Sequence, residues 1–435
     1  MRRLWWFSLL VGMAAHAQQT APDTSLPSQD LVLRAIGTTP EVRAAAAVLG
    51  RAEAEERMRR VGSHEPQLTV IPQTRRIEGE RRYREWEVDL SRGVRWPGKA
   101  RLDREIGAAG REAASLAFED AHHAAARQLL ALWSDWQRAA TAVGLRDSQV
   151  ALWERERASL ARRVQLGDAA GRDLTALDAA LAQARAAAAQ AAADEQTARL
   201  ALSSAFPELP LPDRVHLPPA PVALEGGDQA WSELIVQRSH EIGTAAALAR
   251  QKDAQSRRAR ADRLPDPSVG LRMLSDRGGR ERAFGVTLSI PLGGSYRSAE
   301  AAAASADAMG AEAELAMARR DVARDARQAV AMARASYTIW QRQQEASAAT
   351  EANAQKTERG HALGEIALDE VLLARRAAQE AAIAAGRAEI DAIEAVTRVK
   401  VDAHAMWHRH DGEDDHDAAA EATTPHDLPA LPAMP

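Results

Sequence analysis

The sequence has no cysteine and few aromatic residues, which make up 4% of its 435 positions. The lack of cysteine excludes disulfide frameworks, cysteine-ligated zinc, cysteine nucleophiles and a lipid attached through an N-terminal cysteine. So few aromatic side chains provide little bulk for the cores of ordinary domains. Alanine supplies much of the 46% hydrophobic content, and alanine with arginine and glutamate is typical of long, closely packed helices.

An excess of basic residues is also missing, because Lys and Arg total 56 against 61 for Asp and Glu, a formal charge of −5. Nucleic-acid-binding domains usually carry a basic surplus. The densest arginine group surrounds Gly79 and is interleaved with glutamates, which fits contacts to lipid headgroup phosphates or neighbouring loops better than a nucleic-acid surface. Its members are Arg75, Arg76, Arg81, Arg82 and Arg84. We therefore expect no nucleic-acid partner.

Long hydrophobic runs are absent as well. The apolar stretch at 4–13 is shorter than the ~20 residues of a membrane-spanning helix. It follows Arg2 and Arg3 and precedes the small-x-small triplet Ala15-His16-Ala17. This pattern predicts a secretory signal peptide at 1–17, cleaved before Gln18, in preference to a retained membrane anchor. If the chain lies in a membrane, we expect it to do so through strands.

Two halves of about 200 residues follow the same plan, the signature of an internal repeat. Glu65-Pro66-Gln67-Leu68 matches Asp266-Pro267-Ser268-Val269, and Leu166-Gly167-Asp168 matches Leu363-Gly364-Glu365. The predicted organisation is a signal peptide at 1–17, an extension at 18–27, a first repeat at 28–205, a proline-rich linker at 206–227, a second repeat at 228–408 and an acidic, disordered tail containing His and Pro at 409–435.

Each repeat is predicted to contain two helices, a β-hairpin, one very long helix and a return helix. Proline and glycine separate these elements, and the long segments consist of strong helix formers. A helix of their length measures roughly 100 Å, which suits a conduit across the periplasm. The long helices are expected at about 99–165 and 295–363, the return helices at about 172–204 and 366–408, and the hairpins at about 67–92 and 267–291.

The hairpins alternate in polarity with a period of two, which predicts strands with one apolar face. The apolar residues are Trp86, Val88 and Leu90 in the first half and Phe284, Val286, Leu288 and Ile290 in the second. Strands of this length match the ~9–11 residues that cross an outer membrane, so we expect this face to contact lipid. Because four strands cannot close a wide barrel and open edges are not tolerated in lipid, several chains must share one barrel.

These features resemble the TolC family of outer-membrane efflux proteins over about residues 28–408. The resemblance rests on the duplicated halves and on the helix-turn-helix signatures at 163–174 and 359–372. It also rests on strands that end in Leu-Ser before a Pro-Gly or Pro-Leu-Gly-Gly segment. Trp96-Pro97-Gly98-Lys99-Ala100-Arg101 is similar to the Pro-Gly-Lys-Arg segment of CzcC-like subunits of heavy-metal efflux systems, with Ala100 as a departure.

The resemblance implies a homotrimer in the bacterial outer membrane, with a twelve-stranded barrel and a twelve-helix tunnel in the periplasm. It implies as partners a periplasmic adaptor and an inner-membrane pump of the resistance-nodulation-division type. It implies no enzymatic activity and no cofactor. The adaptor would dock at the helical turns, at Leu166, Gly167, Asp168, Leu363, Gly364 and Glu365.

Acidic residues follow both glycines, namely Asp168 and Asp173 in one half and Glu365, Asp369 and Glu370 in the other. In a trimer such acids would form rings at the tunnel entrance that attract cations. The alternative is that acids near a helix N-terminus cap it and complement its dipole.

Histidines gather near the C-terminus. His404, His408, His410 and His416 lie among carboxylates, and on a helix His404 and His408 would share a face. Imidazole with carboxylate suits Zn, Ni, Co or Cu, so these residues are weak candidate metal ligands. The alternative is a solvated tail without specific binding.

Together these observations predict a mainly helical protein with a β-barrel part that conducts small solutes out of the cell, with divalent heavy-metal cations as the first hypothesis for the substrate. The alternatives are the same channel serving drugs or other organic compounds, and a periplasmic coiled-coil adaptor or scaffold. An apolar strand face argues against the scaffold, which has no use for it.

Overall fold

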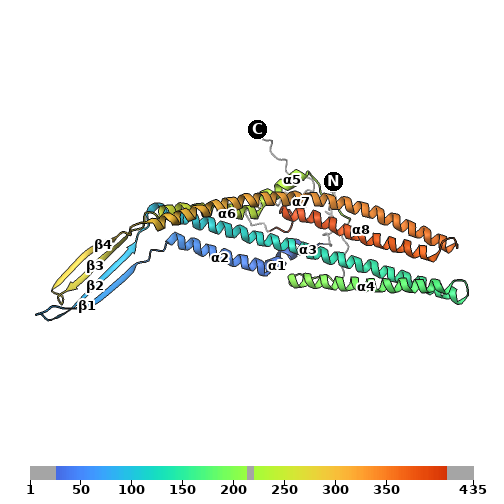
Figure 1. The fold of residues 1–435 in the computed structure, drawn as a ribbon, viewed down its shortest axis with the longest axis horizontal. Coiled ribbons are helices and arrows are strands. Elements are labelled where there is room, and N and C mark those ends of the chain that lie inside the picture. The colour runs from blue at the N-terminus through green and yellow to red at the C-terminus, as the bar shows by residue number, and fades with distance from the viewer. Residues whose placement is uncertain (1–25, 213–219, 409–435) are drawn as a thin grey trace, which may run out of the picture.

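A computed structural model describes residues 26–212 and 220–408 of the chain (Figure 1). The predicted signal peptide, His410 and His416 lie outside the described residues. Both halves repeat the order of two helices, two strands and two helices. The elements are α1 (Gln29–Gly37), α2 (Pro40–Val61), β1 (Gln67–Arg76), β2 (Arg82–Gly93), α3 (Pro97–Gln165), α4 (Gly171–Ala205), α5 (Asp228–Arg238), α6 (His240–Ala261), β3 (Ser268–Asp276), β4 (Glu281–Ser289), α7 (Ser295–Ala362) and α8 (Leu368–Asp402).

The molecule is elongated, with the sheet at one end and the α3–α4 and α7–α8 turns at the other (Figure 1). Helices α3 and α7, of 69 and 68 residues, connect the two ends. At 1.5 Å per residue each is roughly 100 Å long. The predicted mostly helical fold with four strands is therefore confirmed. Within the part of the chain that the structure describes, no helix is both long enough and apolar enough to cross a membrane.

The four strands form one antiparallel sheet in the order β1-β2-β3-β4. The two hairpins join through β2 and β3, where Leu90 is paired with Leu271. In this register the hairpins of the two halves lie side by side in one sheet, with Val70 opposite Val88 in the first hairpin and Leu271 opposite Val286 in the second. The sheet therefore depends equally on both repeats, and β1 and β4 are its two edges.

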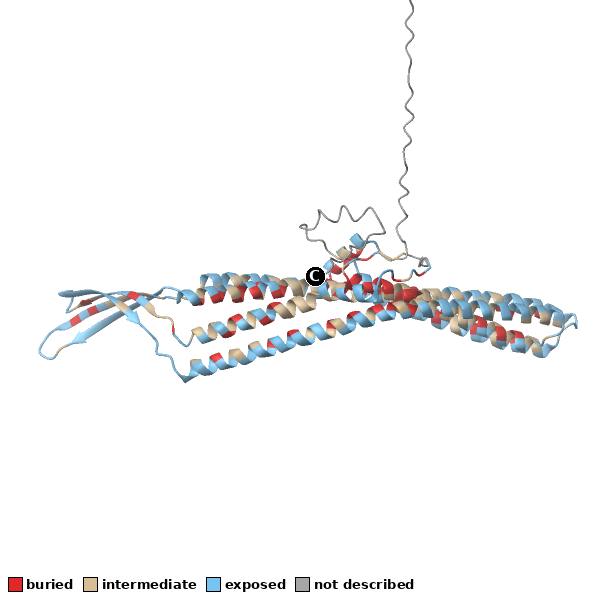
Figure 2. Ribbon diagram, turned by 90° about the horizontal axis from the view of Figure 1, so that it is seen from above, coloured by how far each residue is buried: buried red, intermediate tan, exposed pale blue. Residues whose placement is uncertain are grey.

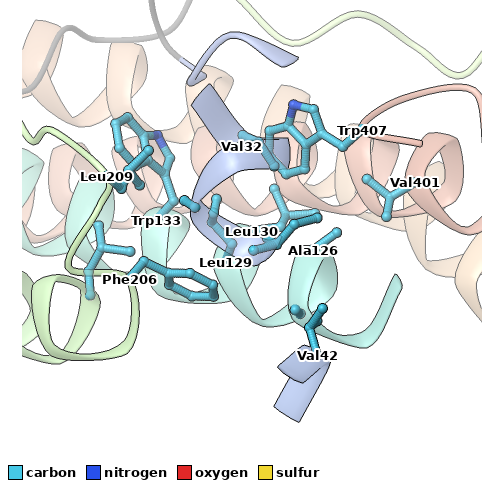
Figure 3. Close-up of a cluster of buried hydrophobic side chains, with 14 of the residues drawn as sticks. Val32, Val42, Ala126, Leu129, Leu130, Trp133, Phe206, Leu209, Val401 and Trp407 are labelled. Atoms are coloured by element: carbon cyan, nitrogen blue, oxygen red, sulfur yellow. The ribbon is translucent and has the colours of Figure 1, made fainter. Parts of the chain in front are cut away.

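Buried residues form stripes where the long helices face one another, and they are densest midway along the molecule (Figure 2). The largest cluster lies there, where α1 packs on α3, on the chain after α4 and on the end of α8 (Figure 3). Its bulkiest members include Trp133, Trp136, Phe206 and Trp407, with Val32 and Leu129 fully buried between them. The Trp133 and Trp136 rings meet edge to face at 5.3 Å, so aromatic side chains provide the bulk of the cluster where several elements converge.

Ion pairs fasten the two repeats along α3 and α8. Arg127 donates to Asp402 at 2.7 Å, and Arg138 donates to Asp391 at 2.6 Å and also to Glu394. Asp402 is buried, yet a hydrogen bond with His123 and the charges of Arg127 and Arg398 outweigh that burial and lower its pKa to about 2. Paired charges therefore replace apolar bulk in a seam made of small residues.

The C-terminal helix ends earlier than the sequence pattern indicates. Helix α8 stops at Asp402 and not at His408. His404 and Trp407 both adopt positive φ angles, 56° and 54°, which a continuing helix does not allow. The burial of Trp407 in the central cluster accounts for the turn, because a straight helix would carry this side chain away from α1 and α3.

Candidate functional site

The two helical turns at the end opposite the sheet have the same backbone structure. Gly167 and Gly364 have φ angles of 83° and 81°, which glycine adopts without strain. In the first turn the amide of Asp168 donates to Arg163 O at 2.8 Å and that of Gly167 to Val164 O at 3.1 Å. The second repeats both bonds, from Glu365 to Gly360 and from Gly364 to His361, at 2.9 Å each. Each turn is thus a Schellman motif, which ends one helix sharply and reverses the chain.

The predicted docking residues are exposed at these turns. Leu166 and Leu363 are 69% and 76% exposed. Asp168 and Glu365 are exposed directly beside them. Both turns lie at one end of the molecule (Figure 1). Each presents the same pair of an apolar and an acidic side chain.

The other predicted entrance acids begin the return helices. Asp173 stands in the first turn of α4, and Asp369 and Glu370 stand in the first turn of α8. Neither helix has a side-chain N-cap hydrogen bond, since alanine occupies both N-cap positions. These three acids therefore do not cap their helices through a side-chain hydrogen bond. They do lie at the helix N-termini, where a negative charge complements the helix dipole. Asp369 and Glu370 are exposed, and Asp173 is half-buried.

Apolar contacts hold the two turns near one another. Trp153, Leu160 and Leu177 form a buried cluster within the α3–α4 hairpin, and Leu368 and Leu372 of α8 pack against it. Within the other hairpin, Arg375 of α8 donates to Glu351 of α7 at 2.8 Å and also binds Glu358. These contacts order both turns without covering the exposed leucines.

At the opposite end, one face of the sheet is apolar. Neighbouring partners on this face include Leu68, Leu90 and Leu271, then Val70, Val88 and Met273. Trp86 and Leu90 are 44% and 49% exposed. The predicted residues of β4 and the position after it are more exposed still: Phe284 68%, Val286 69%, Leu288 64% and Ile290 56%. That this face contacts lipid stays a prediction.

The opposite face of the sheet carries a polar network. Arg272 donates to Glu87 at 2.7 Å, and the Thr287 hydroxyl donates to Asp89 at 3.0 Å. Glu85 accepts from Gln73 at 3.0 Å and forms an ion pair with Arg75 at 3.2 Å. The two faces of this sheet thus suit two different surroundings, one apolar and one aqueous.

The candidate metal ligands His404 and His408 lie in the turn after α8, so the predicted common helix face is wrong. Their rings nevertheless stack at 4.3 Å, and the ring of His240, at the start of α6, lies 4.6 Å from that of His404. Burial lowers the pKa of His240 to about 4 and that of His404 to about 3, and neighbouring histidines add to the effect. Sequence reasoning missed His240, because only the packing of α6 beside the end of α8 brings it here.

The segment at 96–101, called the Lys99 segment below, lies where the helices meet the sheet. Lys99 is 2% exposed and donates to Asp262, Asp266 and Leu264 O at 2.9, 2.8 and 2.7 Å. The indole of Trp96 donates to Pro265 O at 3.0 Å. The segment therefore joins the first repeat to the second, a structural role independent of any substrate.

The chain is similar to solved structures of outer-membrane channels. A membrane protein from Pseudomonas aeruginosa aligns with a TM-score of 0.75 at 18% identity, over 88% of this chain and 91% of that one. CusC, described in terms of folding and transmembrane channel formation, gives 0.72 at 15% identity, over 86% and 91%. The outer-membrane channel OprN gives 0.69 at 19% identity, over 88% and 92%.

The chain has the outer-membrane channel fold. The single-chain fold predicted from the TolC-family resemblance is thus confirmed, whereas the trimeric barrel, the tunnel and the CzcC-like subtype stay predictions. No protein-family model and no curated protein matches the sequence.

Proposed function

We propose that the chain is the outer-membrane channel of a tripartite efflux system and conducts substrates passively to the cell exterior. The observation that carries the proposal is the pairing of an exposed apolar sheet face with exposed helical turns at the opposite end of a molecule roughly 100 Å long. The apolar face suits lipid, and the turns suit a protein partner. A soluble adaptor or scaffold has no need of the apolar face.

The open sheet supports assembly as a homotrimer. In the single chain, β1 and β4 are edges with unpaired backbone groups, which are costly in lipid because no water is available there. Pairing β4 of one chain with β1 of the next removes both edges. Three chains would close a twelve-stranded barrel, and their long and return helices would form a twelve-helix tunnel in the periplasm.

The helical turns support docking of a periplasmic adaptor, which would connect the channel to an inner-membrane pump of the resistance-nodulation-division type. Because both repeats present the same leucine and acid on the same backbone turn, a trimer would offer six similar docking positions around its entrance. The adaptor would bury Leu166 and Leu363, which are exposed in the single chain.

We propose divalent heavy-metal cations as the substrate. The CzcC-like segment supports this choice by resemblance, and the acids Asp168, Asp173, Glu365, Asp369 and Glu370 support it by charge. Convergent carboxylates at a narrow entrance raise the local concentration of cations and oppose anions. The Lys99 segment has a structural role in this chain and adds nothing to the choice beyond the resemblance.

Growth of a deletion strain tests the proposal. The strain, with and without the wild-type chain, is grown on a panel of Zn, Co, Cd, Ni, Cu and Ag salts beside several drugs. We expect the chain to restore tolerance to divalent metals. Restored tolerance to drugs alone would support the organic-compound alternative, and recovery of the chain as a soluble periplasmic monomer would refute the channel.

A further inference from the structure

Three histidine side chains converge midway along the molecule, away from both the turns and the sheet. His240 begins α6, and His404 and His408 lie in the turn after α8. One nitrogen from each ring can be chosen so that all three lie within 4.8 Å of one another. The rings are nearly parallel, at 6° between His404 and His408 and 21° between His240 and His404.

The backbone around these histidines is well fixed. Ser239 separates α5 from α6, and its hydroxyl accepts the amide of Ile242 at 3.2 Å, which places His240 at the first helical position. The turn after α8 is closed by the His404 amide on Val401 O at 3.0 Å. Arg238 then donates to Ala403 O at 2.8 Å, which ties this turn to the end of α5.

One nitrogen of the cluster lacks a partner among the described residues. His240 Nε2 is buried and forms no hydrogen bond. Packing alone does not account for it, because a buried polar nitrogen is normally paired. A metal ion would use the lone pair of this atom, and a stack of rings does not.

The charges around the cluster are mixed. Glu241 follows His240 in sequence, and Asp402 forms a contact of 3.3 Å with His123, whose ring lies 5.2 Å from that of His404. Arg238 is a positive charge near His404, although its guanidinium donates a hydrogen bond to Ala403 O. Asp402 is thus linked to the cluster through the ring of His123.

We propose that His240, His404 and His408 bind a divalent transition-metal ion that joins the end of α8 to the α5–α6 junction. Three imidazoles suit Zn²⁺, Ni²⁺, Co²⁺ or Cu²⁺, whereas Mg²⁺ and Ca²⁺ prefer oxygen ligands. Metal–nitrogen bonds of about 2.0–2.1 Å require the rings to turn so that their nitrogens approach more closely, and three ligands leave a fourth position open. The proposed ion joins two segments of the chain itself, so the inference does not depend on what the channel conducts.

Thermal unfolding of the detergent-solubilised full chain tests the site. The metal-free protein is compared with protein given one equivalent of Zn²⁺ per chain, and Co²⁺ is used in parallel for its visible absorption. We expect Zn²⁺ to raise the melting temperature and Mg²⁺ to leave it unchanged, since a ligand that binds only the folded state stabilises it. Variants His240→Asn and His404→Asn are expected to weaken Zn²⁺ binding about tenfold or more. Asparagine tolerates the positive φ at position 404, so this variant is expected to fold.

Two matched controls identify the ligands. His361→Asn removes a histidine from the last turn of α7, far from the cluster, and is expected to retain the full effect of Zn²⁺. A variant with asparagine at His410, His416 and His426 tests binding by the C-terminal segment instead. The inference is overturned if His240→Asn and His404→Asn keep the wild-type rise in melting temperature, or if the C-terminal variant alone abolishes it.

Discussion

Lys99 illustrates how one residue can join the two halves of a duplicated chain. Its ammonium group lies among Asp262, Asp266 and a backbone carbonyl, all from the second repeat, while Lys99 itself belongs to the first. A buried charge is tolerated only when it is paired and hydrogen-bonded, and here all three donors of the ammonium have acceptors. Removing it leaves two carboxylates close together without their shared cation.

Replacing Lys99 with methionine is therefore expected to lower the free energy of unfolding by about 3 kcal/mol or more, the range for breaking a buried pair. Chemical or thermal unfolding of the detergent-solubilised protein measures it. The matched control is Arg101→Met in the same segment, where an exposed pair with Glu105 at 3.1 Å is expected to contribute less than about 1 kcal/mol. Equal effects of the two substitutions would contradict the role assigned to Lys99.

The ion pairs around Lys99 also predict that the stability of the protein depends on pH. Burial opposes ionisation of Asp262, but hydrogen bonds and charges from Arg258 and Lys99 outweigh it and hold its pKa below the ordinary value of 3.8. A carboxyl group with a lowered pKa in the folded state stabilises that state above its ordinary pKa, and the contribution is lost as the pH falls through the folded value.

We therefore expect the wild-type protein to lose more stability than Asp262→Asn when the pH is lowered from about 5 to about 3. Melting temperatures of both proteins across this range provide the measurement. Parallel pH profiles for the two would show that Asp262 makes no such contribution.

At the scale of elements, the turns show how a short glycine motif sets the course of very long helices. Gly364 has positive φ, and a Cβ at this position would meet no neighbouring atom. The cost of a substitution there is therefore one of backbone conformation alone. Gly144 is the useful contrast, because it lies exposed inside α3 with equally open surroundings and an ordinary helical φ.

Gly364→Ala is expected to destabilise the α7–α8 turn by about 1–2 kcal/mol, whereas Gly144→Ala is expected to stabilise α3 by about 0.5–1 kcal/mol. Hydrogen exchange of peptides covering each position detects both changes, since the amides of Gly364 and Glu365 are hydrogen-bonded in the turn. Faster exchange at the turn in Gly364→Ala and slower exchange around 144 in Gly144→Ala is the expected pattern. The same sign at both sites would contradict it.

At the scale of the whole molecule, the two faces of the sheet differ in polarity, and the proposed membrane location predicts that they respond differently to substitution. Leu288 and Ser289 are adjacent on β4 and point to opposite faces, because successive side chains alternate across a strand. Leu288 is paired with Val269 on the apolar face, and Ser289 is paired with Ser268 on the polar one. The two positions lie at nearly the same depth, so they separate the effect of the face from that of depth.

Leu288→Lys is accordingly expected to cost up to about 2–4 kcal/mol in a membrane-inserted barrel, and Ser289→Lys little. The yield of heat-modifiable trimer in outer-membrane fractions is the measurement. We expect Leu288→Lys to reduce this yield strongly and Ser289→Lys to leave it near the wild-type level. Equal yields would count against a lipid-facing role for Phe284, Val286, Leu288 and Ile290.

The sequence by itself determined the order of the elements, their approximate bounds, the apolar strand face and both glycine turns. These features depend on local properties, namely proline and glycine positions, helix propensity and a period of two, which are visible in a short window. The predicted end of α8 was wrong because of a tertiary contact. The helical sequence pattern continues beyond Asp402, but the burial of Trp407 turns the chain there.

Only the tertiary structure decided which distant residues meet. The three acceptors of Lys99, the ion pairs between α3 and α8, and the approach of His240 to His404 all join positions far apart in the chain. Single charges and histidines have no periodicity that reveals their partners, and the crossing of the long helices sets those contacts. For that reason the sequence indicated a channel-like fold with exposed turns, whereas the histidine cluster emerged only when the start of α6 was packed beside the end of α8.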